Sequence, residues 1–470
     1  MDLRLKQATS CLLVLSCFLA IFSCRKSEQI DTNPALRLEF STDTVFFDTV
    51  FTTLGSVTQQ LRVYNNNDKK VSISSIRLAG GENSDFRLNI DGVATINATD
   101  IEIPAHDSIF IFVKVTVDPN NQDNPLVITD SILFTMNGNL QDIKLVAWGQ
   151  DAIFHKNQNL TGQVFWDSIK PHVIYGYVRV DTASALTILA GTRVYLHANS
   201  KLDILYQSAL KVAGSLDHPV RFQGDRLDPF YRDLPGQWSG IYLEKGSTGN
   251  EINYAIIKNG NYGILIDSAS TYAVPMLKVD NTIIKNTTFD GLYAYASCVI
   301  STNCVIGDCG SSAITLDFGG SYDFRQLTVG NYWGSSVRTG PSIYVRNYSY
   351  DHSGNIIYNG LVKAYFGNAI IYGNLPEEIG LDMKPETDSV YTFDHCLLLT
   401  GRNISSPVNF IGCLVNQDPR YVDVQKYDYR IDSISPAIDK GIPMGVTFDI
   451  LGVDRGITPD LGAYEWVPSL

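Results

Sequence analysis

Short runs of alternating apolar and polar residues fill the chain between residues 36 and 151. Two of them are LRLEFSTDTVFF, which begins at Leu36, and HDSIFIFVKVTV, which begins at His106. Clusters rich in Asn, Asp and Gly separate the runs, as in the segments after Val63 and Leu78. Because a period of two places apolar side chains on one face of a strand, this pattern predicts an antiparallel β-sandwich.

The pattern changes after residue 152, where short apolar strands recur and each ends in a polar corner. Equivalent apolar positions in these strands are Ile257, Ile284, Ile306, Val329 and Ile371, which are 27, 22, 23 and 42 residues apart. Spacing of this size is typical of one turn of a β-solenoid. We therefore expect the last interval to hold two coils of about 21 residues each.

Stacking of coils explains why the pattern repeats. Ile, Val and Leu of one coil lie on those of the next, and one coil alone buries too little apolar surface to be stable. The corners carry Asn259, Asn286, Asp308 and Asn331. Such residues accept the left-handed backbone conformation that a sharp corner needs. A β-helix over residues 152–434 is the fold that this pattern predicts.

Two resemblances support this division. Val63-Tyr64-Asn65-Asn66, followed by Val71, Ile73, Ile76, Leu78, Gly80 and Phe86, resembles the immunoglobulin-like modules of bacterial surface proteins. The segment from Leu186 to Arg226, and Gln237-Trp238-Ser239-Gly240-Ile241 after it, resemble the opening coils of pectate-lyase-like proteins. These resemblances imply an all-β chain, in which a right-handed parallel β-helix is preceded by an antiparallel immunoglobulin-like β-sandwich.

The N-terminus has the pattern of an export signal. Arg4 and Lys6 precede an apolar run from Cys11 to Ser23, which is too short to span a bilayer as a helix. The segment from Ile21 to Cys24 resembles the lipobox of bacterial lipoproteins. That resemblance implies a signal peptide of residues 1–23, a lipid on Cys24 and a tether of residues 24–35. An ordinary signal peptide or an uncleaved anchor is the alternative.

Composition limits the partners of the chain. The 470 residues carry a net charge of −13, and only 18% of them are charged. Binding of nucleic acid needs clustered Lys and Arg, which this sequence lacks. We therefore expect no nucleic-acid partner. We expect an exported protein anchored by lipid, on the outer membrane of a Gram-negative bacterium. After removal of the signal and lipidation, five cysteines remain, and we expect them to act as small buried apolar residues.

The segment from Ser435 to Trp466 resembles the closing segment of secreted β-helix proteins, so we expect residues 435–470 to cap the fold. We expect Arg455 to pair with carboxylates of this segment and to help close the edge of the last coil. The carboxylates are Asp439, Asp449, Asp454, Asp460 and Glu465. The alternative is a cation cluster, because Ca²⁺ prefers oxygen ligands of this kind. We expect no metal and no cofactor, and the sequence does not support Ca²⁺.

No residues in the sequence form a recognisable catalytic motif, so catalytic residues stay unknown. His197 and His395 lie within predicted strands, where either could act as a base. Aromatic residues are dense between residues 238 and 350, and we expect a shallow aromatic cleft there. The predicted ligand-binding residues are Tyr322, Tyr332, Trp333 and Tyr344, with Arg338 and Arg346 available to an acidic sugar.

These observations predict a cell-surface protein that binds or displays glycan or partner proteins without catalysis. The alternative is a polysaccharide lyase or glycoside hydrolase that acts in a groove on the β-helix. A coil face that presents a cluster of carboxylates or basic groups would distinguish the two functions.

Overall fold

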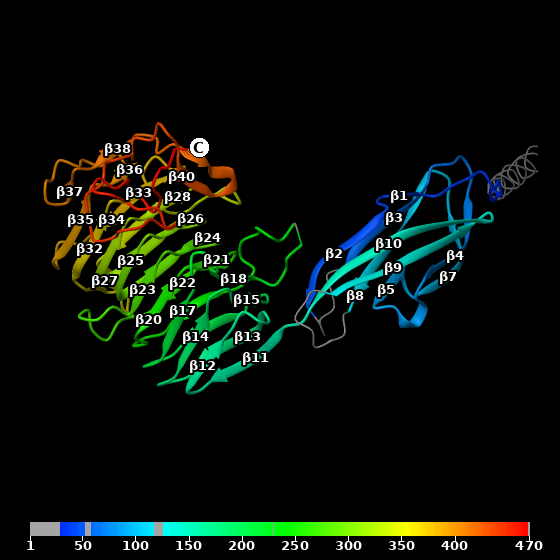
Figure 1. Ribbon diagram of the computed structural model, residues 1–470, viewed down its shortest axis with the longest axis horizontal. Coiled ribbons are helices and arrows are strands. Elements are labelled where there is room, and N and C mark those ends of the chain that lie inside the picture. The colour runs from blue at the N-terminus through cyan, green and yellow to red at the C-terminus, as the bar shows by residue number, and fades with distance from the viewer. Residues whose placement is uncertain (1–28, 52–57, 117–125, 229, 469–470) are drawn as a thin grey trace, which may run out of the picture. The chain divides into compact units, whose positions relative to one another are not determined.

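The computed structural model describes residues 29–51, 58–116, 126–228 and 230–468. The chain forms two compact units, and the division lies between Gln150 and Asp151 (Figure 1). The first unit has two five-stranded sheets. One contains β1 (Glu39–Phe40), β3 (Gln59–Asn65), β8 (Asp107–Val115), β5 (Phe86–Ile90) and β6 (Val93–Ala94). The other contains β2 (Thr44–Phe51), β10 (Asn139–Gln150), β9 (Leu126–Met136), β4 (Val71–Leu78) and β7 (Asn97–Ile103).

Alternation along these strands builds a single apolar core. In β3, for example, Leu61 and Val63 are buried while their neighbours face outward. The pairings within both sheets are antiparallel, with the exception of β2 and β10, which run parallel from the Thr44–Lys144 pair onward. The predicted sandwich is confirmed, but it is not antiparallel throughout.

The second unit is a parallel β-helix, and its strands follow one another in layers from β11 to β38 (Figure 1). Each coil contributes to three stacks of parallel strands, here named A, B and C. Stack A contains β15 (Arg193–Leu196), β18 (Val220–Gly224), β21 (Ala255–Lys258), β24 (Ile283–Thr287), β26 (Val305–Cys309), β28 (Thr328–Asn331), β33 (Ile370–Gly373), β36 (Leu397–Leu398) and β38 (Leu414–Val415). The predicted fold class, a β-helix after a β-sandwich, is confirmed.

Stacks B and C complete each coil. Stack B contains β16 (Lys201–Ile204), β19 (Gly240–Leu243), β22 (Ile264–Ile266), the first parts of β25 (Leu292–Thr302) and β27 (Ile314–Arg325), β29 (Ile343–Arg346) and β34 (Ile379–Asp382). Stack C contains β12 (Gln163–Trp166), β14 (Ala185–Leu189), β17 (Ala209–Ala213), β20 (Asn250–Asn253), β23 (Leu277–Asp280), the second parts of β25 and β27, β32 (Leu361–Gly367), β35 (Ser389–Asp394) and β37 (Phe410–Ile411). The longer strands β11 (Ile153–Leu160) and β13 (His172–Val180) contribute to stacks A and B.

The predicted repeat positions are register partners in stack A. Ile257 pairs with Ile284, Ile284 with Ile306, Ile306 with Val329, and Val329 with Ile371. All five side chains are at most 1% exposed, so they form one continuous apolar row in the interior. This row confirms the stacking of coils that the spacing predicted.

The 42-residue interval, however, is one coil rather than two. Val329 and Ile371 are direct partners, so no complete coil lies between them. The additional residues include an antiparallel hairpin of β30 (Tyr348–Tyr350) and β31 (Ile356–Tyr358). Sequence spacing alone cannot separate two coils from one coil with an insertion of equal length, and strand register decides between them.

The polar corners have the expected backbone conformation at three positions. Asn259, Asn286 and Asp308 have φ values of 67°, 59° and 52°. The amide of Asn286 also donates to Oδ1 of Asn259 on the neighbouring coil at 2.7 Å. Asn331 has a different role, because its Oδ1 accepts a hydrogen bond from the backbone N–H of Cys309.

The five described cysteines are free, and four of them are buried: Cys298, Cys304, Cys309 and Cys396. Burial raises the pKa of both Cys304 and Cys309 to about 12, so these thiols stay protonated. They therefore serve as small core residues. No helix among the described residues is long and apolar enough to cross a membrane. Cys24 and the predicted signal peptide lie outside the described residues.

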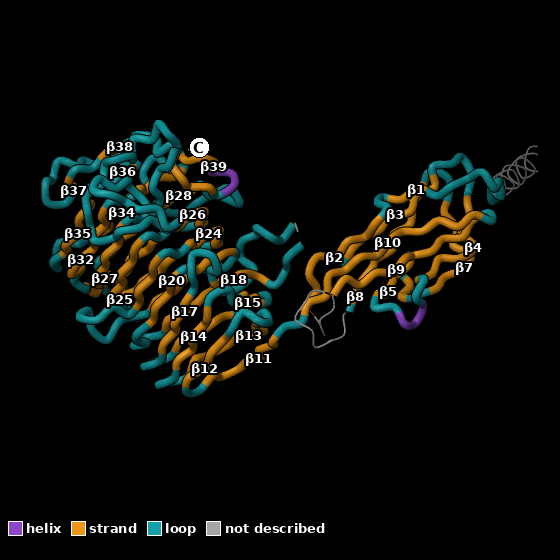
Figure 2. Tube along the Cα trace, in the orientation of Figure 1, coloured by secondary structure: helices purple, strands orange, loops and turns teal. Residues whose placement is uncertain are grey.

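The C-terminal segment lies along the outer side of stack A. After β38 it forms β39 (Tyr421–Asp423), a short 3-10 turn η2 (Val424–Lys426), β40 (Asp428–Ile431) and then mostly loop (Figure 2). The N–H of Ala463 donates to Oγ1 of Thr328 at 2.8 Å, and Asn368 donates to the carbonyl of Ile442 at 2.7 Å. The segment thus crosses the flank of several coils, whereas we expected it to help close the edge of the last one.

Arg455 organises this segment. Its guanidinium pairs with Glu465 and donates to Oδ1 of Asn303 at 2.8 Å. Asp449 and Asp460 accept hydrogen bonds from several backbone N–H groups of the same segment. The expected pairing of Arg455 with a carboxylate is therefore present in the structure.

Candidate functional site

Three of the predicted ligand-binding residues are buried. Tyr322, Trp333 and Arg338 are 1%, 5% and 7% exposed. The hydroxyl of Tyr322 donates to the carbonyl of Gly319 at 2.8 Å, inside the coil. These side chains cannot contact a glycan at the surface, so the predicted cleft is wrong in this respect. Tyr322 is part of the apolar core of the coils, and a linear sequence does not distinguish a buried ring of this kind from an exposed one.

Tyr332 also belongs to a packed cluster rather than to an open face. Its ring centre lies 6.2 Å from those of Tyr421 and Tyr429, which come from the C-terminal segment. These three rings attach that segment to stack A. The predicted site residues therefore do not form one surface.

Tyr344 and Arg346 do lie together, on β29 at the outer face of stack B. The Tyr344 hydroxyl donates to Oδ2 of Asp382 at 3.0 Å. Arg346 donates to both carboxylate oxygens of Asp317, at 2.8 and 2.7 Å. Asp317 also accepts from the Tyr293 hydroxyl at 2.8 Å, so the two predicted residues belong to a wider network.

A row of mostly aromatic side chains runs along this face, one residue from each coil. Its members are successive register partners at an outward position: Tyr242, Leu265, Tyr293, Thr315 and Tyr344. Adjacent coils are about 4.8 Å apart. Side chains repeated at that distance form a strip that is aromatic or apolar at every position except Thr315.

A row of carboxylates runs beside these rings. Glu244, Asp267 and Asp317 stand two residues after Tyr242, Leu265 and Thr315, and Asp382 stands two residues after Gly380, the register partner of Tyr344. Leu243 and Ile266 are partners, so Glu244 and Asp267, which follow them, lie on adjacent coils. We name the two rows together, with Arg346, the stack B face.

The stack B face contains a groove of about 250 Å³. It is lined by Tyr242, Leu243, Glu244, Leu265, Ile266, Asp267, Tyr293 and Tyr295. Burial, together with the nearby charges of Asp203 and Asp267, raises the pKa of Glu244. Among the described residues no hydrogen bond or ion pair holds the Glu244 carboxylate, so it is available to a ligand in the groove.

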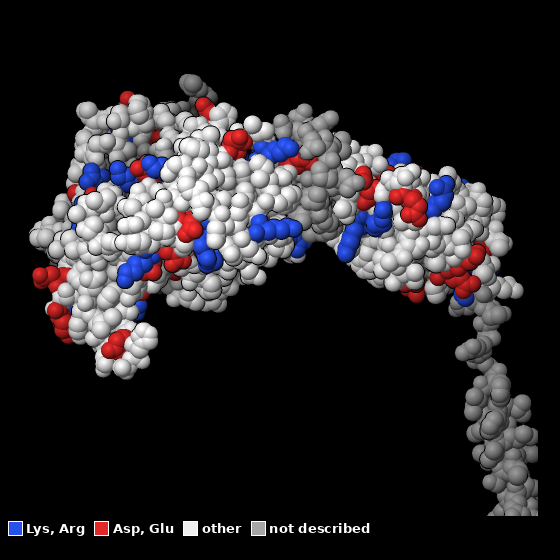
Figure 3. Space-filling model, turned by 90° about the horizontal axis from the view of Figure 1, so that it is seen from below, with Lys and Arg blue, Asp and Glu red and all other residues white. Residues whose placement is uncertain are grey.

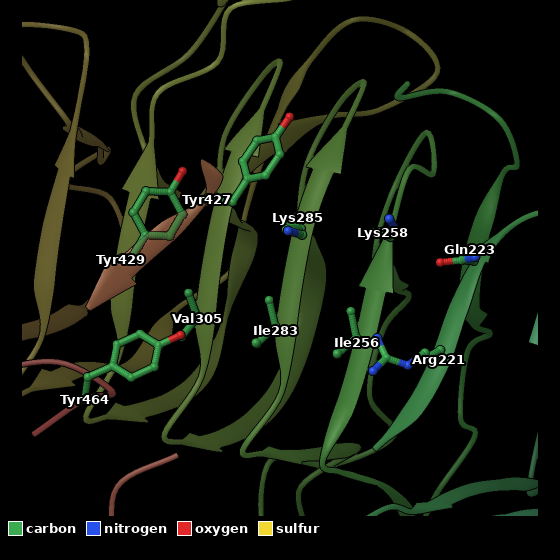
Figure 4. A pocket seen from close by; sticks show the side chains of 11 residues that line it. Arg221, Gln223, Ile256, Lys258, Ile283, Lys285, Val305, Tyr427, Tyr429 and Tyr464 are labelled. Carbon is green, nitrogen blue, oxygen red and sulfur yellow. The ribbon is translucent and has the colours of Figure 1, made fainter. Parts of the chain in front are cut away.

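A second pocket, of about 180 Å³, lies on the outer side of stack A (Figure 4). The C-terminal segment forms one wall with Tyr427, Tyr429 and Tyr464. The strands contribute Arg221, Gln223, Ile256, Lys258, Ile283, Lys285, Val305 and Gly307. We name this the stack A pocket, and unlike the stack B groove it is lined by basic groups.

Sequence reasoning missed most of these residues. The strands Gly263 to Ile266 and Gly291 to Ala294 are recognisable from their glycines and apolar residues. The residue between the two inward apolar side chains of each strand points outward, and this signal identifies Leu265 and Tyr293. Comparison of coils at that position would have predicted the row of rings.

The candidate bases and metal ligands have other partners. Nδ1 of His197 lies 2.8 Å from Oδ2 of Asp225, and Nδ1 of His395 lies 2.7 Å from Oδ1 of Asp394. Neither histidine lines either pocket. Within the described part of the chain, no three His, Cys, Asp or Glu side chains are grouped to hold a metal ion.

Charged side chains of both signs are interspersed on the face drawn in Figure 3. This face therefore lacks, among the described residues, an extended basic surface of the kind that binds a phosphate backbone. The absence of a nucleic-acid partner stays a prediction.

The fold and these surfaces define an all-β protein of two units, whose β-helix carries a groove lined by tyrosines and carboxylates. No protein-family model matches the chain, and no curated protein matches it. Similarities to solved structures are weak. The catalytic unit of the GH87 α-1,3-glucanase from Streptomyces thermodiastaticus is 10% identical, with a TM-score of 0.28, over 76% of this chain and 88% of that one.

Two further solved structures are similar to shorter parts of the chain. A family 123 glycoside hydrolase from Clostridium perfringens is 10% identical, with a TM-score of 0.19, and 26% of each chain is covered. A PapD-like domain of human CEP192 is 7% identical, with a TM-score of 0.18, over 27% of this chain and 94% of that one. Similarities at these TM-scores do not establish a shared fold or activity.

Proposed function

We propose that this protein is a lipid-anchored cell-surface protein that binds glycan on the stack B face. The observation that carries the proposal is the strip of Tyr242, Leu265, Tyr293 and Tyr344 beside a row of carboxylates. Aromatic rings pack against the apolar faces of sugars, and carboxylates accept hydrogen bonds from sugar hydroxyls. A repeated strip offers several equivalent contacts, which suits a chain of sugar residues better than a single small molecule.

Arg346 adds a cationic contact for an acidic sugar. Both carboxylate oxygens of Asp317 accept hydrogen bonds from the Arg346 guanidinium. The guanidinium also lies over the Tyr348 ring, 5.4 Å from its centre. The Arg346 side chain is therefore fixed in place before any ligand arrives. Preorganised groups lose little conformational freedom on binding.

The test measures retention of the protein in gels that contain polysaccharide, with a panel of neutral and uronic-acid polymers. We expect Tyr344→Ala and Tyr293→Ala each to weaken retention several-fold, since loss of one ring contact costs about 1 kcal/mol. Tyr391→Ala, on stack C, is the matched control and should leave retention unchanged. Equal retention of all three variants would refute a glycan site on this face.

Hydrolysis of glycan is a second candidate, and the Glu244 and Asp267 pair favours it. A carboxyl group with a raised pKa next to a second carboxyl group is the arrangement by which glycoside hydrolases divide acid and base roles. Glu244 would serve as the acid, because its pKa is raised by burial and by Asp203 and Asp267.

Reducing ends released from the same polysaccharides distinguish the two functions. Catalysis predicts release by the wild type, which Glu244→Gln abolishes while gel retention persists. Binding alone predicts retention without release. The lipid anchor on Cys24 belongs to the proposal as well.

A further inference from the structure

Two basic side chains of the stack A pocket form no ion pair with any of the described residues. Neither the guanidinium of Arg221 nor the ammonium of Lys285 makes a hydrogen bond or ion pair with any described side chain. This is unusual in a chain of net charge −13, in which acidic groups outnumber basic ones. Lys285 contacts the Tyr427 ring instead, with its Nζ 4.3 Å from the ring centre.

Like charges are adjacent in this pocket. Lys258 and Lys285 are register partners on neighbouring coils, so their side chains project side by side (Figure 4). Burial and the charge of Lys258 lower the pKa of Lys285. Lys258 forms an ion pair with Asp233, with its Nζ 3.0 Å from the carboxylate. Asp233 is therefore already paired with a lysine.

The other nearby carboxylate is also occupied. Asp308 accepts a hydrogen bond from the Tyr429 hydroxyl, and burial raises its pKa to about 7. Around neutral pH this group therefore supplies only part of a negative charge to the pocket. The basic groups exceed the acidic ones here, and an anion would relieve their mutual repulsion.

The pocket also has an apolar floor. Ile256, Ile283 and Val305 are successive register partners that face outward between the basic side chains and the C-terminal segment. Tyr464 and Tyr427 stand over this floor as walls (Figure 4). A bare inorganic ion would leave these surfaces without contacts, whereas an anion with an apolar side would cover them.

We propose that the stack A pocket binds a small organic anion, with one carboxylate or sulfate group directed at Arg221 and Lys285 and an apolar side against the apolar floor. The volume of about 180 Å³ suits a single ring rather than an oligomer. This site is separate from the stack B face and does not depend on the function proposed there.

Ligand-observed NMR on the full chain tests the proposal, with glucuronate and benzoate as organic anions. Glucose and benzyl alcohol are their uncharged counterparts, and inorganic sulfate is the bare anion. We expect saturable binding of at least one organic anion, weakened by salt. Lys285→Met and Arg221→Gln should each weaken it at least about tenfold, since each removes a charge-assisted contact. Lys211→Met, an exposed lysine on β17, is the matched control.

Binding of glucuronate or of benzoate that is lost in both pocket variants supports the proposal. It also shows whether the apolar floor accepts a sugar ring or an aromatic ring. Four results would overturn it: no binding of either organic anion, equal binding of the uncharged counterparts, equal binding of sulfate, or an equal loss in Lys211→Met. Thermal melting checks that the variants are folded. Tyr344→Ala should retain the anion, so failure of this site and failure of the stack B site are distinguishable.

Discussion

Arg338 forms a buried ion pair that we expect to stabilise the coil between Val329 and Ile371. Its side chain is 2% exposed and forms an ion pair with Glu378, which is fully buried. Arg338 also donates to the carbonyl of Asn331 at 3.0 Å. Glu378 accepts from the N–H of Ser342 at 2.9 Å and from that of Leu375 at 2.8 Å. The pair thus connects the loop before β29 with the loop before β34, the partner of β29 on the next coil.

The change Arg338→Met leaves a buried carboxylate without its counter-charge. Removal of one partner of a buried ion pair costs about 3–5 kcal/mol. Adding Glu378→Gln removes the stranded charge, and the amide oxygen can still accept one of the backbone N–H groups. We therefore expect the double variant to recover at least about 2 kcal/mol of that loss.

Urea unfolding of the β-helix, followed by tyrosine and tryptophan fluorescence, measures these differences. The control is Lys426→Met, which removes an exposed ion pair with Asp423 and should not change the midpoint measurably. If Arg338→Met lies within about 1 kcal/mol of wild type, the buried pair does not stabilise the coil as argued. If Arg338→Met weakens glycan retention without destabilising the fold, Arg338 is a ligand contact after all.

Three further predictions concern other parts of the chain. Burial raises the folded-state pKa of Asp308 to about 7, above its unfolded value, so the stability that this group contributes is present at acidic pH and is lost as pH rises through about 7. Melting temperature should therefore fall from about pH 5 to about pH 8 by more in wild type than in Asp308→Asn. Gly330→Ala should destabilise docking of the C-terminal segment by about 1–3 kcal/mol, because a Cβ there would lie 2.3 Å from the Tyr429 ring. Limited proteolysis should therefore cut this segment faster in the variant. A variant that resists the protease as well as wild type does would contradict this prediction. Cys24→Ser should abolish lipid attachment, and a membrane-extracted wild-type protein whose mass includes residues 1–23 would contradict the anchor.

The local pattern of residues was sufficient for the fold class. Alternation in the first unit and the recurrence of Ile257, Ile284, Ile306 and Val329 in the second depend on side-chain direction and on stacking, which act over a few residues or one coil. The corner conformation of Asn259 and Asn286 is a local property as well. Such features can be read from a sequence because each is decided within the segment that carries it.

The candidate sites depended on the tertiary structure. Trp333 and Arg338 lie in an aromatic stretch that looks like a surface platform, yet the coil turns both inward, where Arg338 meets Glu378, 40 residues later in the chain. Conversely, the row of Tyr242, Tyr293 and Tyr344 exists only because coils of unequal length place them in register. Whether a residue faces solvent, and which distant residue lies beside it, follows from strand register and from the path of the C-terminal segment, and these are properties of the packed chain.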